Sequence, residues 1–309
     1  MSKLVVLGSV NADHVLRVPT FPRPGETLHG HDYQVIPGGK GANQAVAAAR
    51  LGADISFIAS VGDDPFGVNI RESFKLDGMD ISGVKIQPDC PTGIAMIQVT
   101  DCGENAICIS SEANARLTAE SLESDLARIG QADYFLTQLE TPLEGVIRGA
   151  QAAKAASTQV ILNPAPARSL PDELLSCVDM ITPNETEAEV LTGVAVTDEQ
   201  SAARAAAVLH EKGITTVLIT LGAKGVWLSE NGQGTVIPGF RVDAIDTTAA
   251  GDTFNGALVT GLLEGLSMQR AIRFAHASAA ISVTRFGAQT SIPARQEVDA
   301  FLAEQDTDR

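Results

Sequence analysis

Short apolar runs alternate with helical stretches along most of the chain. Five runs have the length and composition of buried strands, namely residues 4–7, 55–61, 134–139, 160–162 and 217–221. Apolar or Ala-rich stretches with the character of helices cover residues 43–51, 143–156, 201–211, 252–263 and 268–284. Because strands that alternate with helices form a parallel sheet, we predict an α/β fold with helices on both faces of that sheet.

Two segments, residues 13–36 and 93–111, interrupt this alternation. The first carries three prolines and Gly25 among strand-like pieces, and the second alternates around the turn residues Asp101 and Gly103. Such pieces are typical of hairpins outside the main sheet. Because each segment lies beside a motif with candidate binding residues, we expect the two together to form a small β-sheet lid over a pocket. We expect a single domain over residues 1–309.

The charge balance limits the partners. The chain has 22 Lys and Arg against 38 Asp and Glu, and its formal net charge is −16. This charge argues against extended contact with nucleic acid or with an anionic membrane, so an anionic ligand needs a local positive site. The four cysteines show neither a CxxC pair nor zinc-finger spacing, and we expect reduced thiols in a cytoplasmic protein. The apolar run at residues 4–10 is too short to span a membrane.

The most informative segment, DTTAAGDTFNGAL at residues 246–258, places a carboxylate among small residues where a helix begins. The first amides of a helix have no partner within it, and with the positive end of the dipole they favour an anion such as a phosphate. Ala249, Ala250 and Gly251 are too small to keep a phosphate away. Asp252 is then better suited as a base that takes a proton from an attacking hydroxyl. The alternative for Asp252 is a helix cap.

A second segment, GGKGAN at residues 38–43, leads into an Ala-rich helix. It does not match a P-loop, because no Ser or Thr follows Lys40, nor a dinucleotide fingerprint, because Gln44 stands where the third glycine belongs. Its glycines let backbone amides approach a polar ligand, and Asn43 offers both a donor and an acceptor. A polyhydroxylated ligand would suit this segment. The alternative is a tight turn with Asn43 as the helix cap.

Polar residues also follow the predicted strands. Asn11 and Asp13 come after the first strand, and Glu140 follows residues 134–139. In an open parallel sheet, ligands bind outside the carboxyl ends of the strands. An Asp and an Asn can divide two neighbouring hydroxyls between them, although isolated carboxylates at strand ends are common and often have no function.

Two later turns complete the set of candidates. Asn184 and Glu187 lie in TPNETE, which follows a short strand-like piece, and they could hold Mg²⁺ through water molecules. The turn TLGAKG at residues 220–225 suits a nucleotide phosphate or ribose but is a weak signal by itself. His276 lies in the last Ala-rich helix and is more typical of a packed or nucleotide-contacting residue than of a metal ligand.

The segments GGKGAN, NETE, TLGAKG and DTTAAGD, in this order and at these separations, resemble the ribokinase family of sugar and nucleoside kinases over nearly the whole chain. The segments GSVNADHV, LNPAPARSLPDELL and TRFGAQTSIP are similar to those of bacterial members that act on ribose. Ala249 departs from the broad family pattern DTxGAGD, which has a glycine at that position. Members that act on ribose often carry this alanine.

The resemblance implies a ribokinase-like fold and transfer of the γ-phosphoryl group of MgATP to the 5-hydroxyl of D-ribose. It implies that Asp252 is the catalytic base and that the amides of residues 249–252 form an anion hole. Positions that bind the sugar in the family match Asn11, Asp13, Gly39, Lys40, Gly41, Ala42, Asn43 and Glu140. Positions that contact the nucleotide match Asn184, Thr220, Leu221, Gly222, Ala223, Lys224, Gly225, Gly251 and His276.

The resemblance also implies a monovalent cation, usually K⁺, near the anion hole, and a homodimer formed through the lid. Several ligands of the cation in the family are backbone carbonyls. The matching positions are Asp246, Thr248, Ser282, Arg285, Gly287 and Ser291.

Other functions compete with this one. Another kinase substrate, such as 2-deoxyribose, another small sugar or a nucleoside, stays open, although Asn11 and Asp13 favour two neighbouring hydroxyls. A non-catalytic sugar or nucleotide sensor is disfavoured by Asp252 beside Gly251 and by the acidic NxxE. A dehydrogenase fits less well, because no dinucleotide fingerprint follows the first strand.

Overall fold

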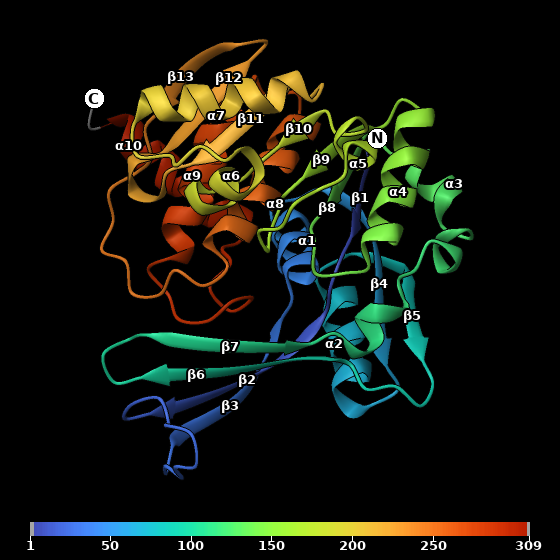
Figure 1. Cartoon of the computed structure of the whole chain (residues 1–309), viewed down its shortest axis with the longest axis vertical. Coiled ribbons are helices and arrows are strands. Elements are labelled where there is room, and N and C mark those ends of the chain that lie inside the picture. Colours follow the sequence, from blue (N-terminus) through green and yellow to red (C-terminus); the bar gives the residue numbers. More distant parts are fainter. Residues whose placement is uncertain (1–2, 308–309) are drawn as a thin grey trace.

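The computed structural model describes residues 3–307, and its main sheet has nine strands in the order β13-β12-β11-β10-β9-β8-β1-β4-β5 (Figure 1). The β11–β12 and β12–β13 pairs are antiparallel, and all other neighbours are parallel. The α/β prediction is confirmed. The strands are β1 (Lys3–Leu7), β4 (Asp54–Gly62), β5 (Asp80–Gln87), β8 (Tyr134–Thr137), β9 (Gln159–Leu162), β10 (Met180–Ile181), β11 (Thr216–Thr220), β12 (Val226–Glu230) and β13 (Gln233–Ile237).

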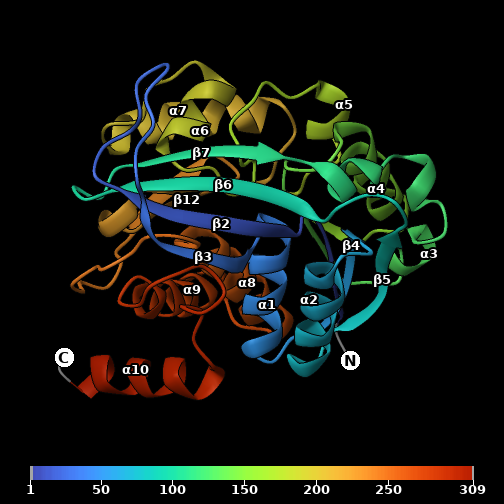
Figure 2. The same cartoon turned by 90° about the horizontal axis from the view of Figure 1, so that it is seen from below.

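Helices cover both faces of the main sheet (Figure 2). On one face lie α1 (Lys40–Arg50), α2 (Pro65–Leu76), α8 (Ala250–Leu263), α9 (Met268–Ser282) and α10 (Arg295–Thr307). On the other lie α3 (Leu126–Ile129), α4 (Leu143–Ala155), α5 (Asp172–Leu175), α6 (Glu185–Thr192) and α7 (Glu199–Glu211). Short 3₁₀ turns are η1 (Glu112–Arg116), η2 (Glu120–Leu122) and η3 (Gly222–Lys224).

Strand β1 explains this layering, because its side chains alternate between two hydrophobic cores. Leu4 and Val6 pack into the core beneath the layer that contains α1 and α8. Val5 and Leu7 pack into the core beneath the layer that contains α4 and α7. A strand that is buried on both faces is apolar at every position, which is the continuous run that the sequence displays.

Helix α1 begins at Lys40, so the prediction of a helix that starts at Asn43 is wrong at its first turn. The residue before the helix is Gly39, with φ of 91°, and it forms no side-chain cap. Gly41 packs directly on the end of β1, where a Cβ atom would lie 2.5 Å from the backbone of Gly8. The glycines therefore permit a close approach of helix and strand inside the first turn, and Asn43 does not cap the helix.

The two segments that interrupt the alternation form a second sheet of four strands in the order β3-β2-β6-β7. The strands are β2 (Asn11–Val18), β3 (His31–Gly38), β6 (Gly93–Thr100) and β7 (Asn105–Ser110). Each segment is a hairpin, and the parallel pair β2–β6 joins the two hairpins. This four-stranded sheet projects from the body of the molecule (Figure 1). Across residues 3–307, no helix has the length and hydrophobicity needed to cross a bilayer.

Candidate active site

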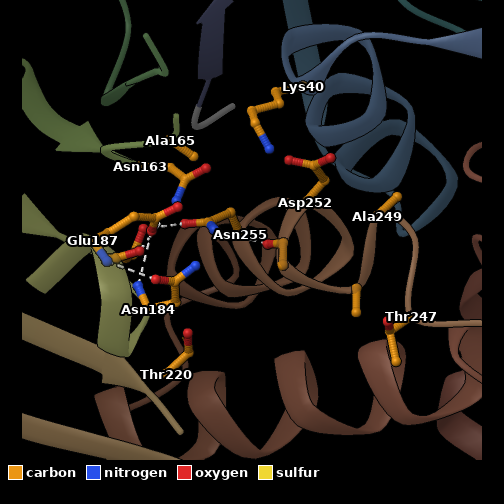
Figure 3. A pocket seen from close by; sticks show the side chains of 13 residues that line it. Lys40, Asn163, Ala165, Asn184, Glu187, Thr220, Thr247, Ala249, Asp252 and Asn255 are labelled. Atoms are coloured by element: carbon orange, nitrogen blue, oxygen red, sulfur yellow. Dashed lines mark hydrogen bonds between the residues drawn. The ribbon is translucent and has the colours of Figure 1, made fainter. Parts of the chain in front are cut away.

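A cavity of about 210 Å³ lies at the carboxyl ends of the central parallel strands (Figure 3). Asn163 and Thr182 directly follow β9 and β10, and Thr220 ends β11. This is the edge at which open α/β sheets bind ligands. The cavity is lined by Lys40, Asn163, Ala165, Thr182, Asn184, Glu187, Thr220, Thr247, Ala249, Ala250, Gly251, Asp252 and Asn255.

The turn before α8 brings free amides to this cavity. Ala249 precedes the helix in the left-handed conformation, with φ of 58° and ψ of 13°. The N–H of Ala250 donates to the carbonyl of Thr247 at 3.2 Å, so this amide is not free for an anion. The prediction that the amides of residues 249–252 form an anion hole is therefore corrected at Ala250. Gly251 and Asp252 follow in the first turn, where amides have no acceptor within a helix, and both residues line the cavity. These two N–H groups and the helix dipole favour an anion here.

The carboxylate of Asp252 is held in place by two amides. Its Oδ2 accepts from Asn43 Nδ2 and its Oδ1 from Gln44 Nε2, each at 2.9 Å. The side chain of Lys40 points toward this carboxylate (Figure 3), and the negative charge of Asp252 is the largest cause of the raised pKa of Lys40. Asp252 does not cap α8, because the residue that precedes the helix is Ala249. The capping alternative is therefore wrong.

Two buried acceptor atoms close to Asp252 have no hydrogen-bond partner in the described chain. They are Oδ1 of Asp13 and Oδ1 of Asn43. Burial, followed by the charges of Glu140 and Asp252, raises the pKa of Asp13 to about 7. Gly38 leaves the space that Asp13 occupies, since a Cβ there would lie 2.0 Å from Asp13 Oδ2. Because an unpaired buried acceptor is costly, these atoms favour a ligand that carries hydroxyl donors.

Asn11 presents a donor to the same region. Its Oδ1 accepts from Asn114 Nδ2 at 2.9 Å, which leaves its own NH₂ group to donate. Glu140 anchors the first turn of α1, because its Oε2 accepts from Ser9 Oγ at 2.6 Å and from Lys40 N at 3.0 Å.

The backbone of the GGKGAN segment is used inside the protein. The amide of Lys40 donates to Glu140, and the amides of Gly41 and Ala42 donate to Ser9. The expectation that these three amides approach a ligand is therefore wrong. The side chains of Lys40 and Asn43 remain as the groups that this segment presents.

Asn184 and Glu187 form a capping box at the start of α6. Asn184 Oδ1 accepts from Glu187 N at 2.8 Å, and Glu187 Oε2 accepts from Asn184 N at 2.9 Å. Both residues also line the cavity, and burial raises the pKa of Glu187. Thr220 pairs with Asn184 through a backbone bridge and lines the cavity, whereas residues 221–225 lie outside the lining.

His276 lies outside the cavity, on α9. It packs against Phe254 with ring centroids 5.3 Å apart, and burial lowers its pKa to about 4. Its Nε2 has no partner in the described residues.

Over residues 3–307, no group of three or more His, Cys, Asp or Glu side chains is arranged to hold a metal ion. The four cysteines are free thiols.

The residues matched to a cation site lie around two neighbouring loops. Asp246 Oδ1 accepts from the amide and the hydroxyl of Thr248, and Asp246 Oδ2 accepts from Gly287 N at 2.9 Å. Although burial raises it, these hydrogen bonds hold the pKa of Asp246 below its usual value. The hydroxyls of Ser282 and Ser291 donate to nearby carbonyls, and Arg285 pairs with Glu297. Arg285, whose side chain is itself a cation, could offer only its backbone carbonyl to a bound cation, whereas Ser282 and Ser291 could offer a carbonyl or a hydroxyl oxygen.

A buried amide network behind Asp252 is not predicted by the sequence patterns. Gln44 Nε2 donates to Asn163 Oδ1 at 3.0 Å, and Gln138 Nε2 donates to Gln44 Oε1 at 2.6 Å. Next to this network, Thr182 Oγ1 donates to Asn255 Oδ1 at 2.6 Å. Gln138, Asn163 and Thr182 each directly follow a strand of the structure, but Gln138 lies inside the run predicted as a strand at residues 134–139, so the sequence alone does not single it out.

The left-handed backbone of Ala249 gives a testable effect on stability. Because a Cβ atom is unfavourable at positive φ, we expect Ala249→Gly to raise the free energy of unfolding by up to about 1 kcal/mol. Ala249→Val should lower it by at least about 1 kcal/mol, since a branched side chain is worse in this conformation. Urea unfolding of the three proteins measures both effects. A glycine variant less stable than the parent would contradict the assignment of strain.

Comparison with known proteins identifies relatives over almost the whole chain. Residues 1–295 match the family described as pfkB family carbohydrate kinase. A ribokinase of Haemophilus influenzae is 58% identical over 299 residues, which cover 97% of this chain and 98% of that protein. A ribokinase of Staphylococcus aureus is 44% identical over 300 residues, 96% of this chain and 99% of the relative. The structure of Arabidopsis thaliana ribokinase complexed with ribose and ATP superposes with a TM-score of 0.91 at 36% identity and covers 98% and 99% of the two chains.

Proposed function

The chain belongs to the pfkB family of carbohydrate kinases, and on that premise we propose that it transfers the γ-phosphoryl group of ATP to O5 of D-ribose, giving ribose 5-phosphate and ADP. Relatives that share 58% and 44% of its residues over nearly their full lengths are ribokinases, and a ribokinase with bound ribose and ATP has the same fold. The single observation that carries the proposal is the position of Asp252. Its carboxylate lies between unpaired acceptors suited to a polyol and free helix amides suited to a phosphate.

The sugar belongs on the side of Asp252 that faces β2 and α1. The unpaired oxygens of Asp13 and Asn43 would accept hydrogen bonds from two sugar hydroxyls. The NH₂ group of Asn11, oriented by Asn114, would donate to a sugar oxygen. Glu140, which holds the start of α1, would supply its remaining oxygen. A ligand with several adjacent hydroxyls satisfies these groups better than an apolar or singly hydroxylated one.

The nucleotide belongs in the cavity lined by Asn184 and Thr220, with its γ-phosphate at the start of α8. In the transfer, the O5–H proton passes to Asp252, a bond forms between O5 and the γ-phosphorus, and the bond from that phosphorus to the ADP oxygen breaks. The amides of Gly251 and Asp252 and the ammonium of Lys40 would offset charge on the phosphoryl oxygens. Phosphoryl transfer depends mainly on alignment and charge stabilisation, so a carboxylate of ordinary basicity is sufficient.

Mg²⁺ fits the acidic side of the cavity. Glu187 lines it with a carboxylate of which one oxygen serves the α6 cap, and a carboxylate that binds through water is typical for Mg²⁺. The bound ion would neutralise charge on the β- and γ-phosphates.

K⁺ fits the paired loops around Asp246, because their polar groups are carboxylate, hydroxyl and carbonyl oxygens, which suit a hard cation. There it would fix the loop that presents the amides of α8. We expect turnover to fall when K⁺ is replaced by a bulky organic cation at constant ionic strength.

A homodimer through the four-stranded sheet is part of the proposal. This sheet exposes large apolar residues on both faces, with Tyr33, Val35 and Met96 on one face and Ile107 and Ile109 on the other. Exposed apolar patches of this kind mark protein interfaces.

The cytoplasm is the proposed compartment, where ATP is available and free thiols persist.

A screen of pentoses, hexoses and nucleosides with MgATP tests the proposal directly. We expect sugar-dependent ADP release to be highest with D-ribose, and ³¹P–¹³C coupling in the product to place the phosphate on C5. Background ADP release without sugar is the control. Efficient phosphorylation of another compound with little activity on ribose would refute the substrate assignment. If none of the compounds raises ADP release above background, the kinase assignment is refuted.

The arrangement of Asp13 and Asn11 predicts discrimination against 2-deoxyribose. Loss of one hydroxyl leaves a buried polar group of the site unpaired, which costs about 1–3 kcal/mol. We therefore expect kcat/KM for 2-deoxyribose to be about 5- to 150-fold lower than for ribose. Steady-state kinetics with both sugars measure the ratio, and equal values would contradict the assigned roles.

A further inference from the structure

A chain of three amide side chains leads from the sheet to the carboxylate of Asp252. Gln138 Nε2 donates to Gln44 Oε1 at 2.6 Å, and Gln44 Nε2 donates to Asp252 Oδ1 at 2.9 Å. The same Gln44 nitrogen donates to Asn163 Oδ1 at 3.0 Å. Gln44 is completely buried and Gln138 is 1% exposed, and neither residue lines the cavity. Neither side chain is therefore placed to touch a nucleotide in that cavity.

The direction of these hydrogen bonds is fixed at the Asn163 end and by the acceptor oxygen of Asp252. Asn163 Nδ2 donates to the backbone carbonyl of Thr182 at 3.1 Å, and that carbonyl can only accept. Asn163 must therefore turn its oxygen toward Gln44. On the other side, Gln138 donates to the oxygen of Gln44. The acceptor oxygens of Asn163 and Asp252 direct both N–H bonds of the Gln44 nitrogen, and the Gln44 oxygen then faces Gln138, whose Oε1 has no partner in the described residues.

This orientation constrains the plane of the Asp252 carboxylate. Asn43 donates to one oxygen and Gln44 to the other, so the group cannot rotate without losing a buried hydrogen bond. Gly8 leaves the space that Gln138 occupies, because a Cβ at Gly8 would lie 2.2 Å from Gln138 Oε1. A reversed Gln44 amide would place its oxygen against the carboxylate, which is repulsive at low local dielectric.

We propose that Gln44, with its amide orientation set by Gln138 and Asn163, is a positioning residue that holds the Asp252 carboxylate in the orientation needed to accept the proton of the sugar hydroxyl. This inference rests on the proposed function, in which Asp252 is the base. It assigns no contact with sugar to Gln44. Loss of the Gln44 amide should therefore lower kcat more than it raises KM for ribose, because sugar binding depends on Asp13, Asn43 and Asn11.

Two methionine substitutions of similar shape test the proposal. Gln44→Met removes the donor to Asp252, and we expect kcat for ribose to fall about 10- to 100-fold while KM for ribose stays within about threefold. Gln138→Met leaves Gln44 in place but removes the group that orients it, and we expect a smaller fall of about three- to tenfold in kcat with the same constancy of KM. Steady-state kinetics on purified full-length protein give both constants.

Thr158→Val is the matched control. The Thr158 hydroxyl is buried and donates to the carbonyls of Ile129 and Ala132, in the layer of α3 and α4. This variant should lose stability in urea unfolding and keep kcat. A folded Gln44→Met with unchanged kcat would overturn the proposal, as would an equal fall of kcat in Thr158→Val. If Gln44→Met does not fold, unchanged kcat in Gln138→Met overturns the proposal and the predicted fall supports it.

The parent protein separates this proposal from the function on which it rests. If the parent phosphorylates no sugar, the proposed function fails and the role of Asp252 as base fails with it. If the parent is active on ribose and both methionine variants equal it, only the positioning role is refuted.

Discussion

Asp252→Asn is expected to keep the fold and to lose at least about two orders of magnitude in kcat for ribose, the usual scale for loss of a general base. The asparagine has nearly the same shape, but it cannot take up the proton of the sugar hydroxyl. It also cannot accept both present hydrogen bonds, because Asn43 and Gln44 donate to different oxygens and an amide offers only one. Lys40 loses the charge that contributes most to its raised pKa. We expect KM for ribose to change less than kcat.

The control for this prediction is a buried aspartate elsewhere in the fold. Asp125 is 4% exposed and pairs with Lys85 at 2.8 Å. Neither residue lines the cavity. Asp125→Asn should lower stability without a large change in kcat. Circular dichroism, urea unfolding and an ADP-release assay on both variants separate the effects. Turnover of Asp252→Asn near that of the parent would remove Asp252 from the catalytic role.

The fold follows from the sequence where local pattern and burial agree. Strands β1, β4, β8, β9 and β11 lie inside the sheet, so their apolar runs identify them. The pattern does not identify β5 and β13, which lie at the sheet edges, because edge strands such as QGTVI in β13 carry fewer apolar residues, and it also misses the short strand β12 beside β13. The start of α1 is missed for a different reason. Glycines such as Gly39 and Gly41 are typical of loops, and only their close packing against the residues that follow β1 explains why the helix begins among them.

Some residues of the candidate site can be predicted from the sequence, and others become visible only in the fold. Asp252, Asn43 and Asp13 stand in short motifs whose spacing is visible in the chain, and the structure brings them together. Gln44 and Gln138 are separated by 94 positions and become partners only because the fold places helix α1 beside the residue that follows β8. Their amide groups carry no charge and match no motif. A side chain that acts by orienting another is therefore visible only once the fold is known, whereas a titratable group at a helix start can be proposed from the sequence.

The second large effect is expected at Asp13, where binding and stability should change in opposite directions. Asp13→Asn should raise KM for ribose about 10- to 100-fold, because hydrogen bonds from a ligand to a charged group contribute about 1.5–3 kcal/mol. We expect kcat to change much less, since Asp13 does not contact the proton that is transferred. Isothermal titration with ribose and steady-state kinetics measure the two effects. An unchanged KM would exclude Asp13 from sugar binding.

The raised pKa of Asp13 gives this prediction its pH dependence. With a pKa of about 7 in the folded protein against 3.8 for the free group, the carboxyl is protonated in the empty site below neutrality, and kcat/KM for ribose should fall about tenfold per pH unit there. The same shift means that the contribution of Asp13 to stability, present below pH 3.8, is lost as the pH rises toward 7. Above that pH the buried charge costs on the order of a few kcal/mol, which Asp13→Asn removes. The variant should therefore exceed the parent in Tm by more at about pH 8 than at about pH 5, and a difference that does not depend on pH would show that Asp13 is not titrating in this range.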